Sequence, residues 1–258
     1  MNKVDIFKKI PKFKFEEKAI KTNSTEFCKV AESRRSVRVY KEEQIPEDVM
    51  RKCLEIALLA PNSSNLQPWE FYWVKNKLKK EKLIKYCLSQ PAAATASELI
   101  VCVSRPDNWK KNNSKMLALF DEAKKEKHKG AWQYYNKIAP LAYNQGPMGV
   151  FGLVKKIIIF LRGLSSPTPR GPASKKDMEI WAQKSTALAC QNLMLAFRAF
   201  GYDSCPMEGM DSIRVKKLLQ LPRKAKICMI ISAGKRASNG VYGRRIRFNK
   251  KDFIKIIE

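Results

Sequence analysis

The chain has 258 residues, 45% of them hydrophobic and 10% aromatic, which excludes a disordered chain and allows a substantial buried core. It carries 51 Lys and Arg against 24 Asp and Glu, a net charge of +27, and it contains one histidine, His128. A single histidine argues against Ser-His-Asp hydrolysis, histidine-rich metal sites and imidazole proton shuttles. Any redox chemistry is therefore expected to use the reactive atoms of a cofactor.

The seven cysteines show no CxxC spacing, and most of them lie in apolar runs, which favours buried reduced thiols over disulfides or a zinc site. Neither a signal-peptide pattern nor a run of about 20 apolar residues is visible, so we expect a cytoplasmic protein without a spanning helix. The positive residues are spread along the chain, and no nucleic-acid-binding signature focuses them on bases. We therefore expect no specific nucleic-acid partner.

The first elements are helical. Residues 1–25 form an N-terminal arm in which lysines alternate with apolar residues, as in a segment that packs on a larger body. Residues 26–34 are predicted to be helical, with Ser24 or Thr25 as the cap. The next helix covers residues 46–60, because its apolar residues recur at three- and four-residue steps between two prolines.

Three later segments are predicted strands: residues 69–74, residues 99–103, which we expect at the centre of the sheet, and residues 226–234. A short helix is predicted at residues 81–87. Residues 185–200 form a helix with hardly any polar face, so it must be buried in one core or between two subunits. Since helices and strands interleave, the fold class is α/β, or α+β with helices packed around a mixed sheet.

An atypical insertion occupies about residues 127–176, where nine Lys or Arg occur and no acidic residue does. Its centre, residues 146–164, is apolar with a basic interruption and leads into a Pro- and Gly-rich loop at 167–172. The favoured interpretation is a segment that packs over the core or covers a pocket. The alternative is an amphipathic segment that rests on an anionic membrane surface.

Two polar segments could bind a phosphorylated heterocycle. The first, Ser33-Arg-Arg-Ser-Val-Arg38, offers guanidinium and hydroxyl donors, and Arg grips phosphate through paired hydrogen bonds. The second lies between Pro61 and Pro68, and five of its six residues can donate or accept hydrogen bonds. That polarity exceeds what a connecting turn needs, and it suits a flat ring with several carbonyls and nitrogens.

Two further segments follow near the C-terminus. In the loop at residues 205–211, Pro and Gly would let the backbone approach a ligand closely. In residues 243–248, arginines alternate, so that Arg245 and Arg247 point the same way if this segment is extended.

Taken in order, Arg34-Arg-Ser-Val-Arg38, Asn65-Leu-Gln-Pro-Trp69, Pro206-Met-Glu-Gly209 and Arg245-Ile-Arg247 resemble the FMN-dependent nitroreductase family over about residues 26–250. The resemblance implies a single FMN-binding domain over residues 26–258, interrupted by the insertion. It also implies an α+β fold in an intertwined homodimer, with one FMN in each of two sites at the subunit interface.

The resemblance also assigns roles to individual residues. It places the FMN phosphate and ribityl chain on Arg34, Arg35, Ser36 and Arg38, with Arg245 and Arg247 closing on the phosphate. It lines the flavin ring, partly from the partner subunit, with Asn62, Ser63, Asn65 and Gln67. It puts Glu208 and Gly209 near the flavin N5, and Gln90 at the pyrimidine ring. The chain departs from the family where Asn62 replaces a usual Ser and Met210 a usual aromatic residue.

The implied activity is hydride transfer from NAD(P)H to a small electron-poor acceptor, such as a nitroaromatic or a quinone, by a ping-pong mechanism. The chemistry would belong to FMN, with no catalytic side chain and no metal. One alternative keeps the flavin for another task, such as reductive dehalogenation. Another is a membrane-peripheral protein that binds an anionic bilayer through residues 146–164 and has a secondary flavin site.

Overall fold

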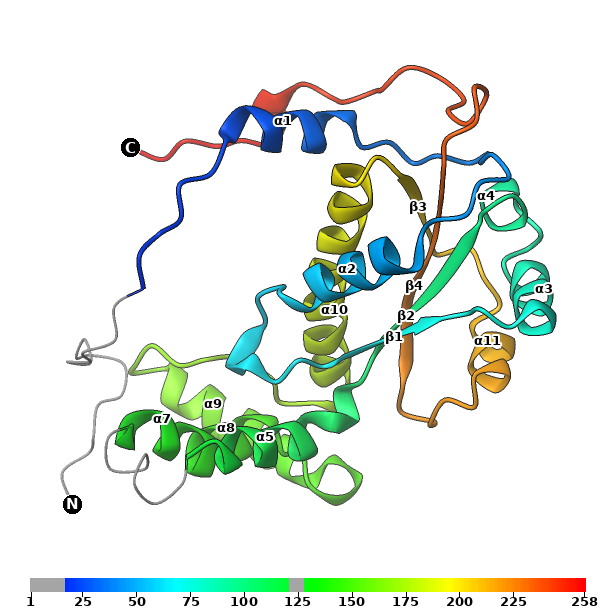
Figure 1. Cartoon of the computed structure of the whole chain (residues 1–258). Helices are drawn as coiled ribbons and strands as arrows, with labels where there is room; N and C mark the ends of the chain where they lie inside the picture. Colours follow the sequence, from blue (N-terminus) through cyan, green and yellow to red (C-terminus); the bar gives the residue numbers. More distant parts are fainter. Residues whose placement is uncertain (1–16, 121–127) are drawn as a thin grey trace.

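The computed structural model describes residues 17–120 and 128–258 (Figure 1). Most of the predicted N-terminal arm, residues 1–16, lies outside the described residues, and residues 17–23 are exposed without regular structure. Helix α1 (Ser24–Ser33) begins two residues earlier than predicted. Its cap is Asn23, whose side chain accepts hydrogen bonds from the backbone of Thr25 and Glu26, so neither predicted cap residue has that role.

Four antiparallel strands form the sheet in the order β1-β2-β4-β3. Their bounds are Trp69–Trp73 for β1, Glu98–Ser104 for β2, Asp203–Met207 for β3 and Lys226–Gly234 for β4. The α+β class and the three predicted strands are confirmed, with β2 inside the sheet. Within the described residues the four strands do not make a mixed sheet, because the parallel contact is a single bridge between Ser36 and Ser204.

Strand β2 has both faces covered, and all seven of its residues are buried. Leu99, Val101 and Val103 point to one side, into a core shared with helices on that face. Ile100 and Cys102 alternate to the opposite core, as the two-residue period of a strand requires. The first face is covered by α3 (Lys77–Tyr86), α4 (Pro91–Ala94) and α11 (Ser212–Leu218), as Figure 1 shows.

The second face is covered by α2 (Glu47–Leu58) and α10 (Lys175–Ala199), which pack on each other. Helix α10 begins ten residues before the predicted start at 185, because the Ser174 side chain caps it by accepting from the Asp177 N–H at 3.1 Å. Residues 175–184 are not predicted from the sequence to belong to the helix, because their lysines and acids interrupt the apolar pattern of residues 185–200. Helix α10 contributes Leu193 and Phe197 to the core of its own chain, so much of its apolar surface is buried within one chain, while Leu188 and Phe200 are exposed.

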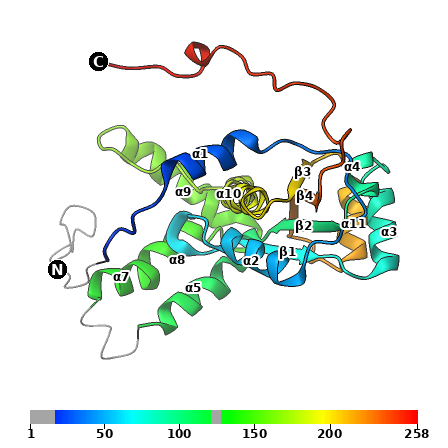
Figure 2. The same cartoon turned by 45° about the horizontal axis from the view of Figure 1, so that its top comes forward.

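The described part of the predicted insertion, together with α5 (Trp109–Ala118) before it, forms a helical end of the molecule, away from α3 and α11 in Figures 1 and 2. A small core joins it to the first half of α10, with Tyr143 and Ala139 packed against Trp181. Among the described helices, none is both long and apolar enough to cross a bilayer. The helices of this end are α5 (Trp109–Ala118), α7 (Lys129–Gln133), η3 (Tyr134–Ile138), α8 (Ala139–Tyr143) and α9 (Val150–Gly163).

Candidate functional site

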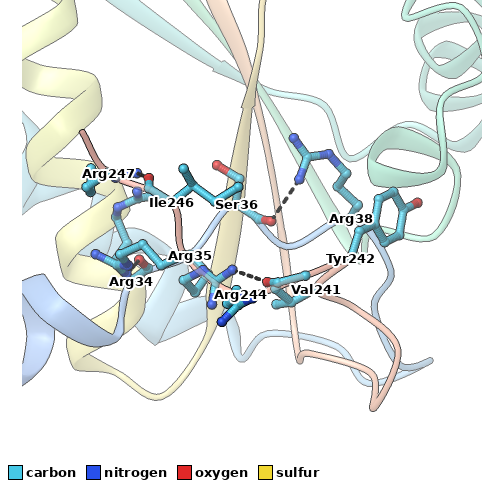
Figure 3. Close-up of a pocket in the computed structure, with 11 residues that line it drawn as sticks. Arg34, Arg35, Ser36, Arg38, Val241, Tyr242, Arg244, Ile246 and Arg247 are labelled. Atoms are coloured by element: carbon cyan, nitrogen blue, oxygen red, sulfur yellow. Dashed lines mark hydrogen bonds between the residues drawn. The ribbon is translucent and has the colours of Figure 1, made fainter.

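Segments from opposite ends of the chain line one pocket of about 270 Å³ (Figure 3). Six arginines face it and none of its lining residues is acidic. Six of the predicted site residues are brought together here, all of them assigned by the resemblance to the FMN phosphate or ribityl chain. The lining residues are Arg34, Arg35, Ser36, Arg38, Val241, Tyr242, Gly243, Arg244, Arg245, Ile246 and Arg247.

Guanidinium–carbonyl hydrogen bonds hold the two segments together. Arg35 Nη2 donates to Gly243 O at 2.5 Å, and Arg245 Nη2 donates in return to Arg34 O at 2.5 Å and to Glu32 O at 2.6 Å. A guanidinium has five N–H donors, so these contacts fix the two side chains and still leave donors for an anion.

The pocket has a positive potential that nothing in its lining neutralises. Burial, followed by the nearby charges of Arg245 and Arg247, lowers the pKa of Arg34. A guanidinium remains charged despite such a shift. The repulsion among these groups would be relieved by a bound anion, which is the physical condition for a phosphate site.

Strand β3 continues from this pocket toward the other predicted residues. The Val37 N–H donates to Ser204 O at 3.2 Å, which places Ser36 beside the start of β3. Burial raises the pKa of the adjacent Cys205 thiol, while the charges of Arg38 and Arg34 act in the opposite direction.

The prediction of a loop at residues 205–211 is wrong at its start, because residues 205–207 belong to strand β3.

Gln90 and Gly209 are in contact at the end of β3. Gln90 Nε2 donates to Gly209 O and to Cys87 O, both at 3.0 Å. A Cβ on Gly209 would have Gln90 Nε2 as its nearest neighbour at 3.9 Å, so the space over this glycine is open. Glu208 and Gly209 are both exposed, which leaves this surface accessible to a ligand.

The polar loop before β1 has an unusual backbone. Ser64, Asn65 and Gln67 have φ values of 59°, 47° and 44°, in the left-handed region that residues other than glycine seldom occupy. Asn62 Oδ1 fixes the turn by accepting from the Gln67 N–H at 2.7 Å. Strained backbone of this kind persists where surrounding contacts enforce it, often at functional sites, and the side chains of Ser63, Asn65 and Gln67 are exposed.

Tyrosines of the insertion hold this loop. The hydroxyl of Tyr143 lies 3.0 Å from Ser63 Oγ and 2.8 Å from Ser64 Oγ, and the hydroxyl of Tyr134 lies 2.5 Å from Ser64 Oγ. Tyr135 adds a hydrogen bond from its hydroxyl to Ser64 O at 3.1 Å. The sequence offered no signal for these contacts, since the tyrosines follow in a segment that matched no motif.

One chain does not bring all the predicted residues to one place. The loop at 62–67 contributes nothing to the arginine pocket, and Figure 1 shows it on the far side of α2 from the segment at 241–247. Sequence reasoning also left out Arg244 and Tyr242. Both line the pocket, and Arg38 Cζ lies 5.6 Å from the centre of the Tyr242 ring, a cation–π distance.

Comparisons with known proteins point to one family. A protein-family model described as "Nitroreductase family" matches residues 31–235. Protein DrgA of Synechocystis sp. is 28% identical over 214 residues, covering 82% of this chain and 85% of the relative. A protein of Thermus thermophilus named NADH dehydrogenase is 27% identical over 213 residues, covering 83% and 88%.

A solved structure from Exiguobacterium sibiricum, described as a nitroreductase in complex with FMN, has a TM-score of 0.63 with this chain. Its sequence identity is 22%, and the match covers 92% of this chain and 99% of that one. At that identity, the likeness shows a shared fold.

Proposed function

Because this chain belongs to the nitroreductase family, we propose that it is an FMN-dependent oxidoreductase that transfers hydride from NAD(P)H to a small electron-poor acceptor by a ping-pong mechanism. The acid-free pocket built by arginines from both ends of the chain is the observation that supports this proposal most strongly.

The residues of the pocket fit the phosphate of FMN. A phosphate dianion needs several converging donors and positive charge, and Arg supplies both in a fixed planar fork. Arg34, Arg35 and Arg38 on one segment and Arg245 and Arg247 on the other would hold the phosphate and ribityl chain, with the Ser36 hydroxyl as a further donor. A bound phosphate would neutralise the repulsion between Arg34 and the nearby charges of Arg245 and Arg247, and this relief would add to the affinity for FMN.

The remaining predicted residues would bind the flavin ring. Gln90, Glu208 and Gly209 lie together at the end of β3. In the proposal, the loop holding Asn62, Ser63, Asn65 and Gln67 comes from the partner subunit of a homodimer, since it is remote from the pocket of its own chain.

Exposed apolar side chains at the C-terminus support the dimer. Many large apolar side chains exposed within a short segment favour a contact site. In this tail, Ile246, Phe248, Phe253, Ile254, Ile256 and Ile257 are each exposed by 63% or more.

When bound, FMN would supply the redox centre, which takes a hydride from the reduced nicotinamide and passes electrons to the acceptor. The chain's own residues would bind and orient. The arginines hold the anion, the amides and hydroxyls of residues 62–67 fix the ring by hydrogen bonds, and Gly209 leaves one side open to close approach. No side chain is required to carry a covalent step.

An absorption spectrum of the purified protein, before and after flavin addition, tests the proposal directly. Arg38→Ala/Arg247→Ala should lose flavin, because each removes a charged hydrogen-bonding group worth roughly 1.5–3 kcal/mol, so that the Kd for FMN rises at least roughly 100-fold. The matched control is Lys79→Ala/Lys82→Ala, two exposed cations on α3. Normal flavin content in the arginine variant would show that the cofactor is placed wrongly.

The task of the flavin is a separate question. Turnover of NADH and NADPH with a panel of nitroaromatics, quinones and halogenated aromatics separates the reductase from the dehalogenase alternative, since the products differ. A peripheral contact with an anionic membrane is compatible with either task, because α9 contributes nothing to the arginine pocket.

A further inference from the structure

Helix α9 presents an unusually apolar outer surface. Among the large apolar residues exposed across the described chain, the highest density along the sequence is in and next to this helix. Eight α9 side chains are 49–64% exposed: Val150, Phe151, Leu153, Val154, Ile157, Ile158, Phe160 and Leu161. Leu164 after the helix, at 72%, extends the same surface, and Met148 before the helix is exposed by 93%.

The apolar side chains share one face. At 3.6 residues per turn they occupy roughly half of the circumference of α9. Lys155 and Arg162 border this arc on one side, and Lys156 borders it on the other. An amphipathic helix with an apolar front and cations along both edges has the form of a helix that lies in the plane of a membrane interface.

The rear of α9 is fixed to the body of the protein. Gly152 is buried so tightly that a Cβ there would lie 2.6 Å from Ala173 O. Lys155 Nζ donates to Ala142 O at 2.8 Å, and Arg170 Nη1 donates to Ile159 O at 3.2 Å near the end of the helix. These contacts hold the helix so that its apolar face remains directed outward.

Charge identifies the occupant of this face. Residues 129–176 contain no acidic side chain, and the next acid, Asp177, is engaged in accepting from the Ala173 N–H at 2.8 Å. A second copy of the chain meeting α9 through the same face would bring like charges together without a counter-charge. An anionic lipid surface offers both an apolar layer and negative charge.

Helix length defines how such a surface would be used. The 14 residues of α9 span about 21 Å, less than the hydrocarbon core of about 30 Å. The helix is therefore suited to lie along the interface rather than to cross it.

We propose that α9 and its flanking residues 148–164 form a docking surface that binds the protein to the surface of an anionic lipid bilayer. The apolar arc enters the boundary between headgroups and acyl chains, and Lys156 and Arg162 at its edges contact lipid phosphates. This contact is independent of the proposed flavin chemistry.

Vesicle co-sedimentation of the full chain tests the proposal, with vesicles of phosphatidylcholine and of an equimolar mixture with phosphatidylglycerol. Binding is expected to the mixed vesicles and much more weakly to the neutral ones. Ile157→Glu/Phe160→Glu should weaken that binding roughly tenfold or more, and Lys156→Glu/Arg162→Glu should weaken it as well. Equal binding to both kinds of vesicle, or none to either, would overturn the proposal.

Matched controls place the same substitutions elsewhere. Leu78→Glu/Ile213→Glu changes two exposed apolar residues of α3 and α11, and Lys79→Glu/Lys82→Glu changes two exposed cations; both should bind vesicles as the parent does. If they lose as much binding as the α9 variants, general surface character is responsible and the proposal fails. Flavin content and far-UV circular dichroism of each variant establish that it is folded.

Sedimentation velocity separates the docking surface from a subunit interface. The α9 variants should keep the mass of the parent protein. A change of mass in Ile157→Glu/Phe160→Glu would show that a second copy covers this face, and would overturn the assignment to lipid.

Discussion

The arginine pocket and the α9 surface are both basic, yet they are built for different anions. In the pocket, guanidiniums from two distant segments converge, and backbone carbonyls fix Arg35 and Arg245. On α9, the cations are spread along the edges of an apolar face. The first arrangement suits one compact anion bound by directed hydrogen bonds, and the second suits an extended layer of negative charge.

The difference shows that net charge alone is a poor guide to function. The excess of +27 says only that anions are attracted. What the anion is depends on whether the positive groups converge on a point or border an apolar surface. If the two regions are separate sites, flavin binding and vesicle binding should respond differently to changes made in one of them.

The largest effect is expected at Gly152, where α9 packs against the rest of the protein. Gly152→Ala would place a methyl group 2.6 Å from Ala173 O and 2.7 Å from Gln145 Oε1, and relieving such overpacking costs about 2 kcal/mol. Vesicle binding and protection of α9 from hydrogen exchange should both fall, while flavin content stays that of the parent protein.

Gly130→Ala is the control for this substitution. Gly130 lies in α7 of the same insertion, and a Cβ there would meet nothing within 4 Å. Its variant should match the parent in exchange and in vesicle binding. Equal exchange at α9 in the two variants would mean that Gly152 does not hold the helix in place.

The second-largest effect is expected from salt concentration, which should weaken vesicle binding more than FMN binding. Raising the ionic strength from about 0.1 M to about 1 M shortens the Debye length from about 10 Å to about 3 Å. Binding of anionic vesicles should fall roughly tenfold, since the cations of α9 are spread over an exposed surface. The Kd for FMN should change less, because the half-buried Arg34 and Arg35 are screened less than fully exposed cations.

The comparison would fail if the two responses were alike. Titration of FMN by fluorescence and vesicle co-sedimentation, carried out at the same salt concentrations, measure both. Parallel losses would mean that the pocket also attracts its ligand mainly by diffuse charge.

Periodic apolar patterns made much of the fold predictable from the sequence. Strand β4 occupies the predicted residues 226–234, and β2 extends the prediction by one residue at each end, because a continuous apolar run fits a strand covered on both faces. Strand β3 was missed, since its five residues, Asp203–Met207, include a proline and show no alternation. Its place depends on pairing with β4, a contact between distant parts of the chain.

The candidate site was predictable to a similar extent. Arginine-rich motifs identified the pocket, because charge and fork geometry are properties of the side chains themselves. The left-handed backbone at Ser64 and the tyrosines that hold it were not predictable. Those features arise where the insertion folds back on the loop, and no local pattern encodes such packing.

The packing of the insertion against this loop gives the smallest of the expected effects. Tyr143 is buried beside Trp181, with ring centroids 4.8 Å apart, and its hydroxyl reaches Ser63 and Ser64. Tyr143→Phe keeps the ring and removes the hydroxyl, which should lower the free energy of unfolding by about 1 kcal/mol. Ser64 keeps its contact with Tyr134, so the loop should loosen without unfolding.

The proposed position of this loop over the flavin ring gives the substitution a functional consequence. A looser loop should raise the KM for the acceptor while the Kd for FMN, governed by the distant arginines, and vesicle binding both stay unchanged. Tyr86→Phe is the control, because the Tyr86 hydroxyl makes no hydrogen bond within residues 17–120 and 128–258. If Tyr143→Phe instead weakened FMN and vesicle binding together, the insertion would couple the two surfaces, and they could not be treated as independent sites.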